Sequence, residues 1–351
     1  MQRVNRRRVV LGLAAATAPL MMGLTSAGAV SPDDAGGRRT IPEPGDGVTS
    51  SVLLVARRGR VLRREAFGLA NREWSTPMRP DAEFRVGSIT KQFTAVAILQ
   101  LAESRKLSLD DAVTAHIASA PAEWRQITLR HLLTHTSGIP NFTEVPGWEQ
   151  WLDRDADEVI EFVGKLPLQF APGSQFAYDN TGYVILGDIV QKTAGLPLDA
   201  YLRAHVFDPL GMRYTGFVSD TVLPLRAFGY RRQGSAWADT PWQSNIHNSG
   251  AGGLYSNVDD LLAWDRGLHD GKLISAALMR QMFTDYGHGY GFGYSIASSD
   301  GRSVWEHNGH VAGFSAMLCH YPEQDLTVIV LSNDDAAPVE TLAHKLAASY
   351  L

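Results

Sequence analysis

A serine and a lysine three residues apart, Ser88 and Lys91, open a long apolar run in the sequence. The run at 92–104 has helical spacing, so the two side chains are expected about one turn apart on the same face. The unpaired N–H groups and the positive dipole end of that helix would lie beside the serine hydroxyl. Because the run is mostly apolar, the lysine should lose hydration, and its pKa should fall until it can accept a proton. The pair predicts an activated nucleophile in the first turn of a helix.

The alternative interpretation of this pair is structural. A Ser-x-x-Lys pattern arises readily by chance in a chain of this length, so it is weak by itself. Ser88 would then only cap the helix, and Lys91 would extend its amine to water. Other parts of the sequence must decide between the two interpretations.

A tyrosine and an asparagine two residues apart, Tyr178 and Asn180, supply a second group. They follow a Pro-Gly turn at 172–173 and precede a helix expected from Thr181, which places them on a loop. From an extended loop both side chains can point the same way, the phenol relaying a proton and the carboxamide holding a substrate carbonyl. Residues 255–257 repeat the Tyr-x-Asn spacing, so this pattern does not decide by itself.

His307 and Gly309 form a third group, at the end of a strand-like run, and are candidates for substrate binding. A glycine at that place would let a substrate backbone approach closely. The backbone N–H group next to it could face an oxyanion.

The three patterns, in this order and with these separations, resemble the motifs of the serine β-lactamase-related family. That family includes class C β-lactamases, D-alanyl-D-alanine carboxypeptidases, D-aminopeptidases and esterases. The likeness runs from about residue 47 to 349 and includes flanking stretches at 84–91, 131–138 and 252–256. Because the family tyrosine follows a Pro-Gly turn and precedes a Gly-Tyr helix, the resemblance favours Tyr178 over Tyr255.

The resemblance implies a role for each of these residues. Ser88 would attack a carbonyl, Lys91 and Tyr178 would handle its proton, and Asn180 would orient the substrate. The backbone N–H groups of Ser88 and His310 would hold the oxyanion. An acyl-enzyme would form and be released by water, so neither a metal nor an organic cofactor is implied. Either Lys91 or Tyr178 could be the immediate base, and the two are expected to titrate as a coupled pair.

His307 departs from the β-lactamases, which generally carry lysine at that position. An imidazole with a reference pKa of about 6.5 is mostly neutral at pH 7, so it is a poorer anchor for a substrate carboxylate. Histidine there resembles the carboxypeptidase and aminopeptidase branches. The resemblance thus implies a serine hydrolase of the D-alanyl-D-alanine carboxypeptidase or D-aminopeptidase type, acting on a small molecule or peptide. A carboxylesterase, a β-lactamase and a non-catalytic penicillin-binding or peptidoglycan-binding module are the alternatives.

Other patterns in the sequence favour structural roles. His131 and His135 are four residues apart and could hold zinc, but Leu132 stands where a metalloprotease needs glutamate, so no metal site is predicted. Glycines alternate with aromatic residues at 287–294, which is typical of a strand rather than a phosphate-binding loop. Cys319 is the single cysteine and is expected to be a buried apolar residue.

Strand-like runs occur near both ends of the sequence and helical spacing between them. A hairpin is expected over 52–67, and later strands at 290–297, 303–307, 314–321 and 326–332, followed by a helix at 339–349. Helices are expected between them at 129–134, 155–165, 183–193, 198–207, 258–266 and 275–283. The pattern predicts an α+β fold: an antiparallel sheet built from both chain ends and flanked by helices, plus a helical insertion lobe, with a cleft at the seam. The resemblance implies that this is the β-lactamase/transpeptidase-like fold.

Composition limits the class of protein. The chain has 351 residues, of which 44% are hydrophobic and 20% charged, enough for one sizeable globular domain or two joined ones. We expect this hydrolase domain at 47–351, with a sheet lobe at 47–88 and 285–351 and a helical lobe at 89–284. The formal net charge of −5 makes nucleic acid an improbable partner.

The N-terminal residues have the pattern of an export signal at 1–29, followed by a flexible linker at 30–46. The paired arginines Arg6 and Arg7 resemble a twin-arginine signal, with a general secretory signal as the alternative. The apolar run at 9–24 is shorter than the ~20 residues that cross a bilayer. The sequence therefore predicts a secreted or periplasmic protein without a stable membrane span after cleavage.

Overall fold

The computed structural model describes residues 47–149, 152, 154–218, 222–234, 236–240 and 250–351. All of them belong to one compact unit, Thr40–Leu351. The predicted export signal at 1–29 and linker at 30–46 lie outside the described residues. Within the described part, every helix is too short or too polar to span a lipid bilayer.

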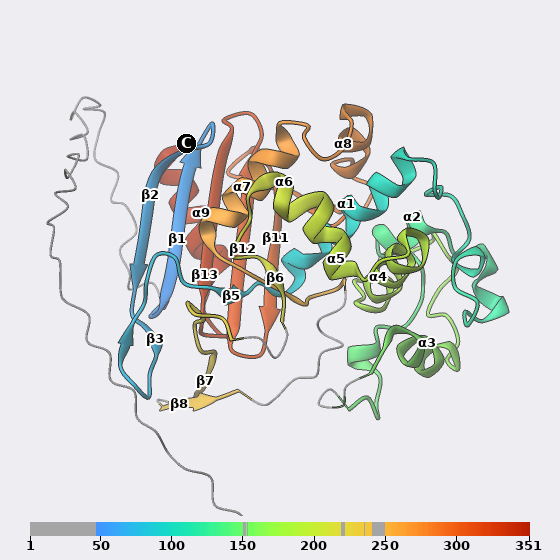
Figure 1. The fold of residues 1–351 in the computed structure, drawn as a ribbon, viewed down its shortest axis with the longest axis horizontal. Coiled ribbons are helices and arrows are strands. Elements are labelled where there is room, and N and C mark those ends of the chain that lie inside the picture. The colour runs from blue at the N-terminus through green and yellow to red at the C-terminus, as the bar shows by residue number, and fades with distance from the viewer. Residues whose placement is uncertain (1–46, 150–151, 153, 219–221, 235, 241–249) are drawn as a thin grey trace, which may run out of the picture. The chain divides into compact units, whose positions relative to one another are not determined.

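A six-stranded antiparallel sheet lies on the left of Figure 1, beside the helical part of this unit, and its strand order is β10-β11-β12-β13-β1-β2. Its strands are β1 (Ser51–Arg57), β2 (Arg60–Phe67), β10 (Ser295–Ser299), β11 (Arg302–Val311), β12 (Phe314–Tyr321) and β13 (Leu326–Ser332). The first and last strands of the chain are neighbours, with Ser51 paired to Ser332 and Arg57 to Leu326. The predicted α+β fold, with a sheet made from both chain ends, is therefore confirmed.

The predicted hairpin forms through a two-residue turn between β1 and β2. Arg58 and Gly59 both have positive φ angles, of 50° and 73°. That backbone matches the right-handed twist of the flanking strands, which is why such turns favour glycine.

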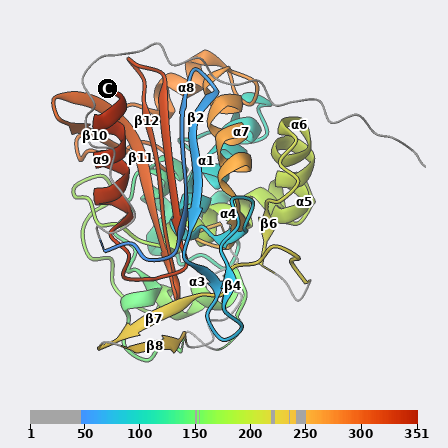
Figure 2. The ribbon, with the colours of Figure 1, turned by 90° about the vertical axis from the view of Figure 1, so that its left-hand side faces the viewer.

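Helices cover both faces of the sheet (Figure 2). Helix α9 (Val339–Tyr350) packs on one face, where Leu346 and its neighbours join the apolar cluster that contains Leu53 and Val55. Helix α7 (Val258–His269) packs on the other face, against β1 and β13. Successive side chains of a strand point to opposite faces, so a strand between two helical layers must be apolar throughout. This explains the continuous apolar run at the start of β1.

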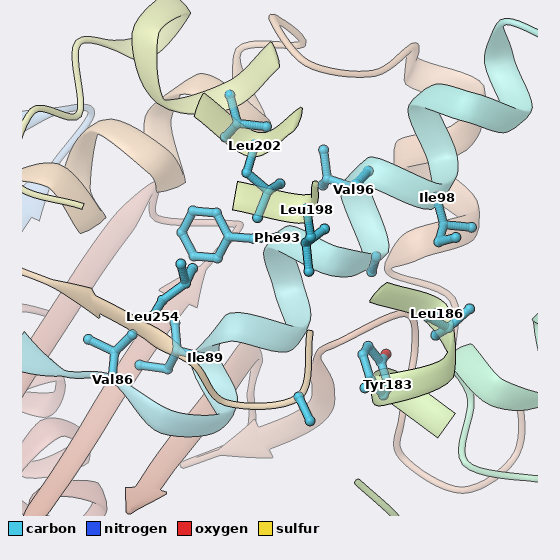
Figure 3. Close-up of a cluster of buried hydrophobic side chains, with 14 of the residues drawn as sticks. Val86, Ile89, Phe93, Val96, Ile98, Tyr183, Leu186, Leu198, Leu202 and Leu254 are labelled. Carbon is cyan, nitrogen blue, oxygen red and sulfur yellow. The ribbon is translucent and has the colours of Figure 1, made fainter. Parts of the chain in front are cut away.

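Helix α1 (Thr90–Glu103) joins the sheet to the helical part of the molecule. It packs against α4 (Thr181–Ala194) and α5 (Leu198–Leu202). In Figure 3, Phe93 and Val96 of α1 lie beside leucines of α5, and Tyr183 of α4 lies on the other side. Because it is enclosed in this way, α1 has no polar face, as its sequence predicts.

The remaining elements are short. Helices α2 (Leu129–Leu133) and α3 (Ala156–Gly164) pack on α4, and a three-stranded sheet has the order β5-β9-β6. The strands of this small sheet are β5 (Phe84–Arg85), β9 (Leu254–Ser256) and β6 (Gly216–Phe217). The other short strands and helices are β3 (Leu69–Asn71), β4 (Thr76–Pro77), β7 (Tyr230–Gln233), β8 (Ala236–Asp239), α6 (Asp208–Leu210) and α8 (Ala276–Met282).

The segment at 287–294 is a loop, so the strand expected over 290–297 begins only at Ser295. Gly287, Gly289 and Gly293 have φ angles of 95°, 67° and 74°, which an extended strand does not contain. The alternation of glycine with aromatic residues therefore reflects repeated turns, and the strand interpretation was wrong.

Candidate active site

Ser88 lies in a single 3-10 turn, Gly87–Ile89, and helix α1 begins only at Thr90. The sequence predicts the serine inside the first α-helical turn. The difference arises because Gly87, with a φ angle of 51°, bends the chain as it leaves β5. Thr90 then donates its hydroxyl to the Gly87 carbonyl at 2.7 Å, which fixes the turn.

Lys91 is completely buried, and its amine points at the serine. Its Nζ lies 3.1 Å from Ser88 Oγ, 2.8 Å from Asn180 Oδ1 and 2.8 Å from the Ala251 carbonyl oxygen. Burial lowers the pKa of this amine to about 7, although the Asp179 carboxylate acts in the opposite direction. The amine therefore exchanges its proton near neutral pH, as the sequence predicts.

Tyr178 approaches Ser88 from the loop before α4, and its hydroxyl donates to Ser88 Oγ at 2.8 Å. Although 36% of this residue is exposed, the protein surrounds its hydroxyl, and the resulting desolvation raises the pKa of Tyr178 above its ordinary value. The phenol therefore keeps its proton. Tyr255, the other tyrosine with this spacing, lies in β9, where it pairs with Arg85 and Gly216.

The Asn180 side chain forms hydrogen bonds with Lys91 on one side and with Asn141 and Thr143 on the other. Its Oδ1 accepts from Lys91, and its Nδ2 lies 3.4 Å from Asn141 Oδ1 and 3.5 Å from Thr143 Oγ1. The carboxamide thus fixes the direction of the Lys91 amine in addition to any contact with a substrate.

His307 lies on β11 and is buried, with both ring nitrogens in hydrogen bonds. Nδ1 lies 2.5 Å from the Asn308 carbonyl oxygen, and Nε2 lies 2.8 Å from the Tyr290 hydroxyl. Burial, with a further contribution from the Lys91 charge, lowers the pKa of His307 to about 3. The imidazole is therefore neutral throughout the physiological range, more completely than the sequence suggests.

Gly309 brings β11 against the serine turn. A Cβ atom on Gly309 would lie 2.0 Å from the Val86 carbonyl oxygen, and one on Gly87 would lie 2.7 Å from His310 N. Neither position can carry a side chain. The backbone nitrogen of His310 therefore lies beside the turn that holds Ser88, so the two N–H groups singled out by sequence come from facing segments.

The sequence did not single out Tyr290, which hydrogen-bonds to His307. The available signal was misread, because its glycine-flanked position was assigned to a strand.

His135 was considered only as a zinc ligand, yet it lies under the Tyr178 ring with centroids 4.4 Å apart. Its Nδ1 accepts from the Asp179 backbone N–H at 3.2 Å. His131 serves elsewhere, accepting from Thr128 N in the cap of α2. His135 thus packs beneath Tyr178, whereas His131 caps helix α2.

Two side-chain groups in the described residues carry metal-type donor atoms away from Ser88. They are Asp265, His269 and His320, and Glu306, Cys319 and His344. The Asp265 carboxylate lies 3.4 Å from a ring nitrogen of His269 and 3.1 Å from one of His320. The Glu306 carboxylate accepts from His344 at 2.8 Å and from the Cys319 thiol at 3.5 Å. Contacts between the side chains within each group account for these arrangements. Cys319 is buried, in agreement with the sequence.

Comparison with known proteins gives a consistent result. The family model described as Beta-lactamase matches residues 38–351. A D-aminopeptidase of Gluconobacter oxydans (strain 621H) is 31% identical over 320 residues, which are 87% of this chain and 59% of that protein. Esterase EstB of Burkholderia gladioli is 39% identical over 189 residues, 49% of this chain and 48% of the esterase. The chain thus spans about half to three fifths of these two relatives.

Two solved structures resemble the fold over most of its length. The octameric penicillin-binding protein homologue from Pyrococcus abyssi has a TM-score of 0.77 and 30% identity, covering 86% of this chain and 73% of that one. A D-stereospecific amidohydrolase from Streptomyces sp. has a TM-score of 0.74 and 25% identity, covering 85% and 93%.

Proposed function

The chain belongs to the Beta-lactamase family, and from that premise we propose that it is a serine hydrolase in which Ser88 forms an acyl-enzyme. The observation that carries the proposal is the convergence of two proton-handling groups on one hydroxyl. Lys91 Nζ and Tyr178 Oη lie 3.1 and 2.8 Å from Ser88 Oγ. Such distances are what a nucleophile and its base require.

Lys91 is the general base in this mechanism. In its neutral form the amine has two N–H groups, which Asn180 Oδ1 and the Ala251 carbonyl accept, so its lone pair is left facing Ser88. Tyr178 cannot take this role, because desolvation raises the pKa of its phenol and keeps it protonated. The structure thus favours one of the two alternatives that the sequence leaves open.

The reaction then proceeds in two steps. Ser88 Oγ bonds to the substrate carbonyl carbon while its proton passes to Lys91, and the backbone N–H groups of Ser88 and His310 stabilise the oxyanion. When the carbon–nitrogen or carbon–oxygen bond breaks, the proton moves from Lys91 through the Tyr178 hydroxyl to the leaving group. Water attacks the resulting ester and gives its proton to the same pair. The acyl carbon–Oγ bond then breaks, the proton returns to Ser88 Oγ, and the acid is released.

The substrate class follows from the charge of the third motif. His307 is neutral and both its nitrogens are occupied, so it offers no cation for a substrate carboxylate. This favours amides of D-amino acids, as hydrolysed by aminopeptidases and amidases, over peptides with a free C-terminal carboxylate and over β-lactams. The similarity to a D-aminopeptidase and to a D-stereospecific amidohydrolase supports the same choice. An esterase is the second candidate, supported by the 39% identity to EstB.

Intact-protein mass spectrometry after treatment with a fluorophosphonate tests the nucleophile. We expect one adduct on the wild-type chain and on the control variant Ser119→Ala, whose serine lies at an exposed site paired to Asp157, and none on Ser88→Ala. An equal adduct on Ser88→Ala would overturn the assignment.

Relative rates test the substrate class. D-alanine p-nitroanilide should be hydrolysed faster than a peptide that ends in D-Ala-D-Ala and faster than a chromogenic cephalosporin. The reverse order would reject the aminopeptidase proposal. Turnover of p-nitrophenyl acetate without turnover of the anilide would establish the esterase.

We also propose that the protein acts outside the cytoplasm, because 1–29 has the charged, apolar and small-residue order of an export signal. Cell fractionation of the full chain should find the activity outside the inner membrane. Loss of export in the double variant Arg6→Lys and Arg7→Lys would indicate the twin-arginine route, and unchanged export the general secretory route. Retention of the wild-type chain in the cytoplasm would contradict the proposal.

A further inference from the structure

His307 has a single neutral tautomer, which follows from what its two nitrogens face. A carbonyl oxygen can only accept, so the nitrogen that contacts the Asn308 carbonyl, Nδ1, must carry the hydrogen. The other nitrogen, Nε2, then has a lone pair and accepts the hydroxyl hydrogen of Tyr290 at 2.8 Å. The tyrosine is thus the only side chain among the described residues that hydrogen-bonds to this imidazole.

Tyr290 is held in place by the loop on which it lies. Asp285 Oδ1 accepts the backbone N–H groups of Gly287, His288 and Gly289 at 2.8, 2.9 and 2.8 Å, which closes the turn before the tyrosine. The backbone N–H of Ile296 donates to the Gly289 carbonyl at 2.8 Å and ties the loop to β10. These hydrogen bonds fix the backbone position from which the Tyr290 side chain projects.

Aromatic rings enclose the Tyr290 side chain, which is 4% exposed. Its ring centroid lies 4.8 Å from that of His135, 5.8 Å from that of Phe176 and 6.4 Å from that of Tyr178. The titratable or charged groups around His307 are Tyr290, Tyr178, His135 and Lys91, and Tyr183 and Asp179 act in turn on Tyr290. Among the described residues, no carboxylate hydrogen-bonds to the imidazole. An imidazolium at this place would lie near the Lys91 amine and would have no carboxylate in hydrogen-bonding contact among the described residues.

We propose that Tyr290 is a specificity-determining residue: by donating to Nε2 of His307 it holds the third motif neutral, so that the site accepts carbonyl substrates without a neighbouring carboxylate and discriminates against those that have one. The proposal rests on the function proposed above, and it assigns the discrimination to a residue that touches His307 rather than the reacting atoms. Tyr290 acts by fixing which nitrogen carries the hydrogen and by filling the space that water would need to solvate an imidazolium.

The Tyr290→Phe variant removes this donor while it keeps the ring. Nε2 then faces an apolar edge or an entering water, and water can stabilise the protonated form. Tyr286→Phe is the matched control, because Tyr286 lies on the same loop but donates its hydroxyl to the Gln281 carbonyl instead.

Nitrogen NMR of the full chain with ¹⁵N-labelled histidine gives a direct readout, with His307 assigned from the spectrum of His307→Gln. We expect one neutral tautomer with hydrogen on Nδ1 and no titration between pH 5 and pH 8, in the wild type and in Tyr286→Phe. Tyr290→Phe should show mixed tautomers or a titration in that range. A wild-type His307 that titrates there, or a Tyr290→Phe spectrum identical to wild type, would overturn the proposal.

Kinetics with a matched substrate pair give the second readout, one peptide ending in D-Ala-D-Ala amide and the same peptide ending in the free acid. The preference of kcat/KM for the amide should fall about tenfold at pH 6 in Tyr290→Phe, through KM of the acid, because a hydrogen bond to a charged group is then gained. Unchanged preference would overturn the specificity role. If the proposed hydrolase function is wrong, the fluorophosphonate will not label Ser88, but the NMR result for His307 can still hold. The two proposals can therefore fail separately.

Discussion

Lys91 is completely buried, and its amine faces three hydrogen-bond acceptors. Desolvation disfavours the charged form, whereas the acceptors and the Asp179 carboxylate favour it. The first effect is larger, so the pKa of the amine is about 7. A base with this pKa is about half deprotonated at neutral pH, and it is still basic enough to accept the serine proton.

The pH dependence of kcat/KM should therefore have one acid limb with its midpoint near pH 7. Below it, Lys91 is protonated and cannot accept, so the rate should fall roughly tenfold per pH unit. His307 does not contribute to this limb, because its pKa is lowered to about 3. Rates with D-alanine p-nitroanilide between pH 5 and pH 9 measure the limb.

Tyr178→Phe separates the two proton-handling groups. The variant should be slower at every pH but should keep the same midpoint, because the base is still present. A limb that disappears in Tyr178→Phe would instead assign the titration to the tyrosine.

Among the helices, strands and turns, the contact between β11 and the 3-10 turn Gly87–Ile89 matters most for catalysis. Two glycines without room for a Cβ atom bring the two backbones together, and the nitrogen of His310 thereby comes beside the serine turn. Backbone donors at such a seam are rigid, since each belongs to an element held by its own hydrogen bonds.

Gly309→Ala should separate the two elements, because its Cβ atom would lie 2.0 Å from the Val86 carbonyl oxygen. The removal of one oxyanion donor should lower kcat about 100-fold. Asn308→Ala, an exposed neighbour on the same strand, is the control and should keep kcat within about twofold of wild type. Circular dichroism should show that both variants retain the fold, and an unchanged kcat in Gly309→Ala would contradict this account.

Some elements could be predicted from the sequence and others could not, for physical reasons. The hairpin, the buried helix after Ser88 and the strands at both chain ends follow from patterns of apolar residues, which burial alone imposes. The loop at 287–294 could not be predicted, because alternation of glycine with aromatic residues fits both a strand and a chain of turns, and positive φ angles are set by tertiary contacts. Tyr290 was missed for the same reason.

The candidate site divides in a similar way. Ser88 and Lys91 were identified from their residue types and spacing together with the resemblance to the serine β-lactamase-related family, which also favoured Tyr178 over Tyr255. The structure brings Ser88, Lys91 and Tyr178 within hydrogen-bonding distance. The degree of desolvation at His307 was not predictable, since the rings packed on it, Tyr178 and Tyr290, come from separate segments, and Tyr290 packs in turn on His135.

The sheet lies between two apolar layers and packs against both. Loss of packing on one face should therefore destabilise the active site on the other. Leu346 of α9 is fully buried on the face opposite Ser88's helix. Leu346→Ala should cost about 2–5 kcal/mol of unfolding free energy. In urea, loss of activity and loss of circular dichroism should coincide.

Thr341→Ala is the matched control, because Thr341 is an exposed residue of the same helix. Its unfolding free energy should lie within about 0.5 kcal/mol of wild type. If Leu346→Ala keeps its activity in urea after its ellipticity is lost, the two layers are independent and this description of the molecule is wrong.

Pairing of β1 with β13 also constrains how the chain can be made. A ribosome synthesises β1 early, and the strand that completes its hydrogen bonds emerges almost at the end of translation. Until then one edge of an apolar strand stays open, and the contacts that remain to be formed are distant in sequence, which slows folding and exposes the chain to aggregation. A chain truncated before β13 is therefore expected to lack the assembled sheet and to aggregate or be degraded rather than to form a partly active enzyme.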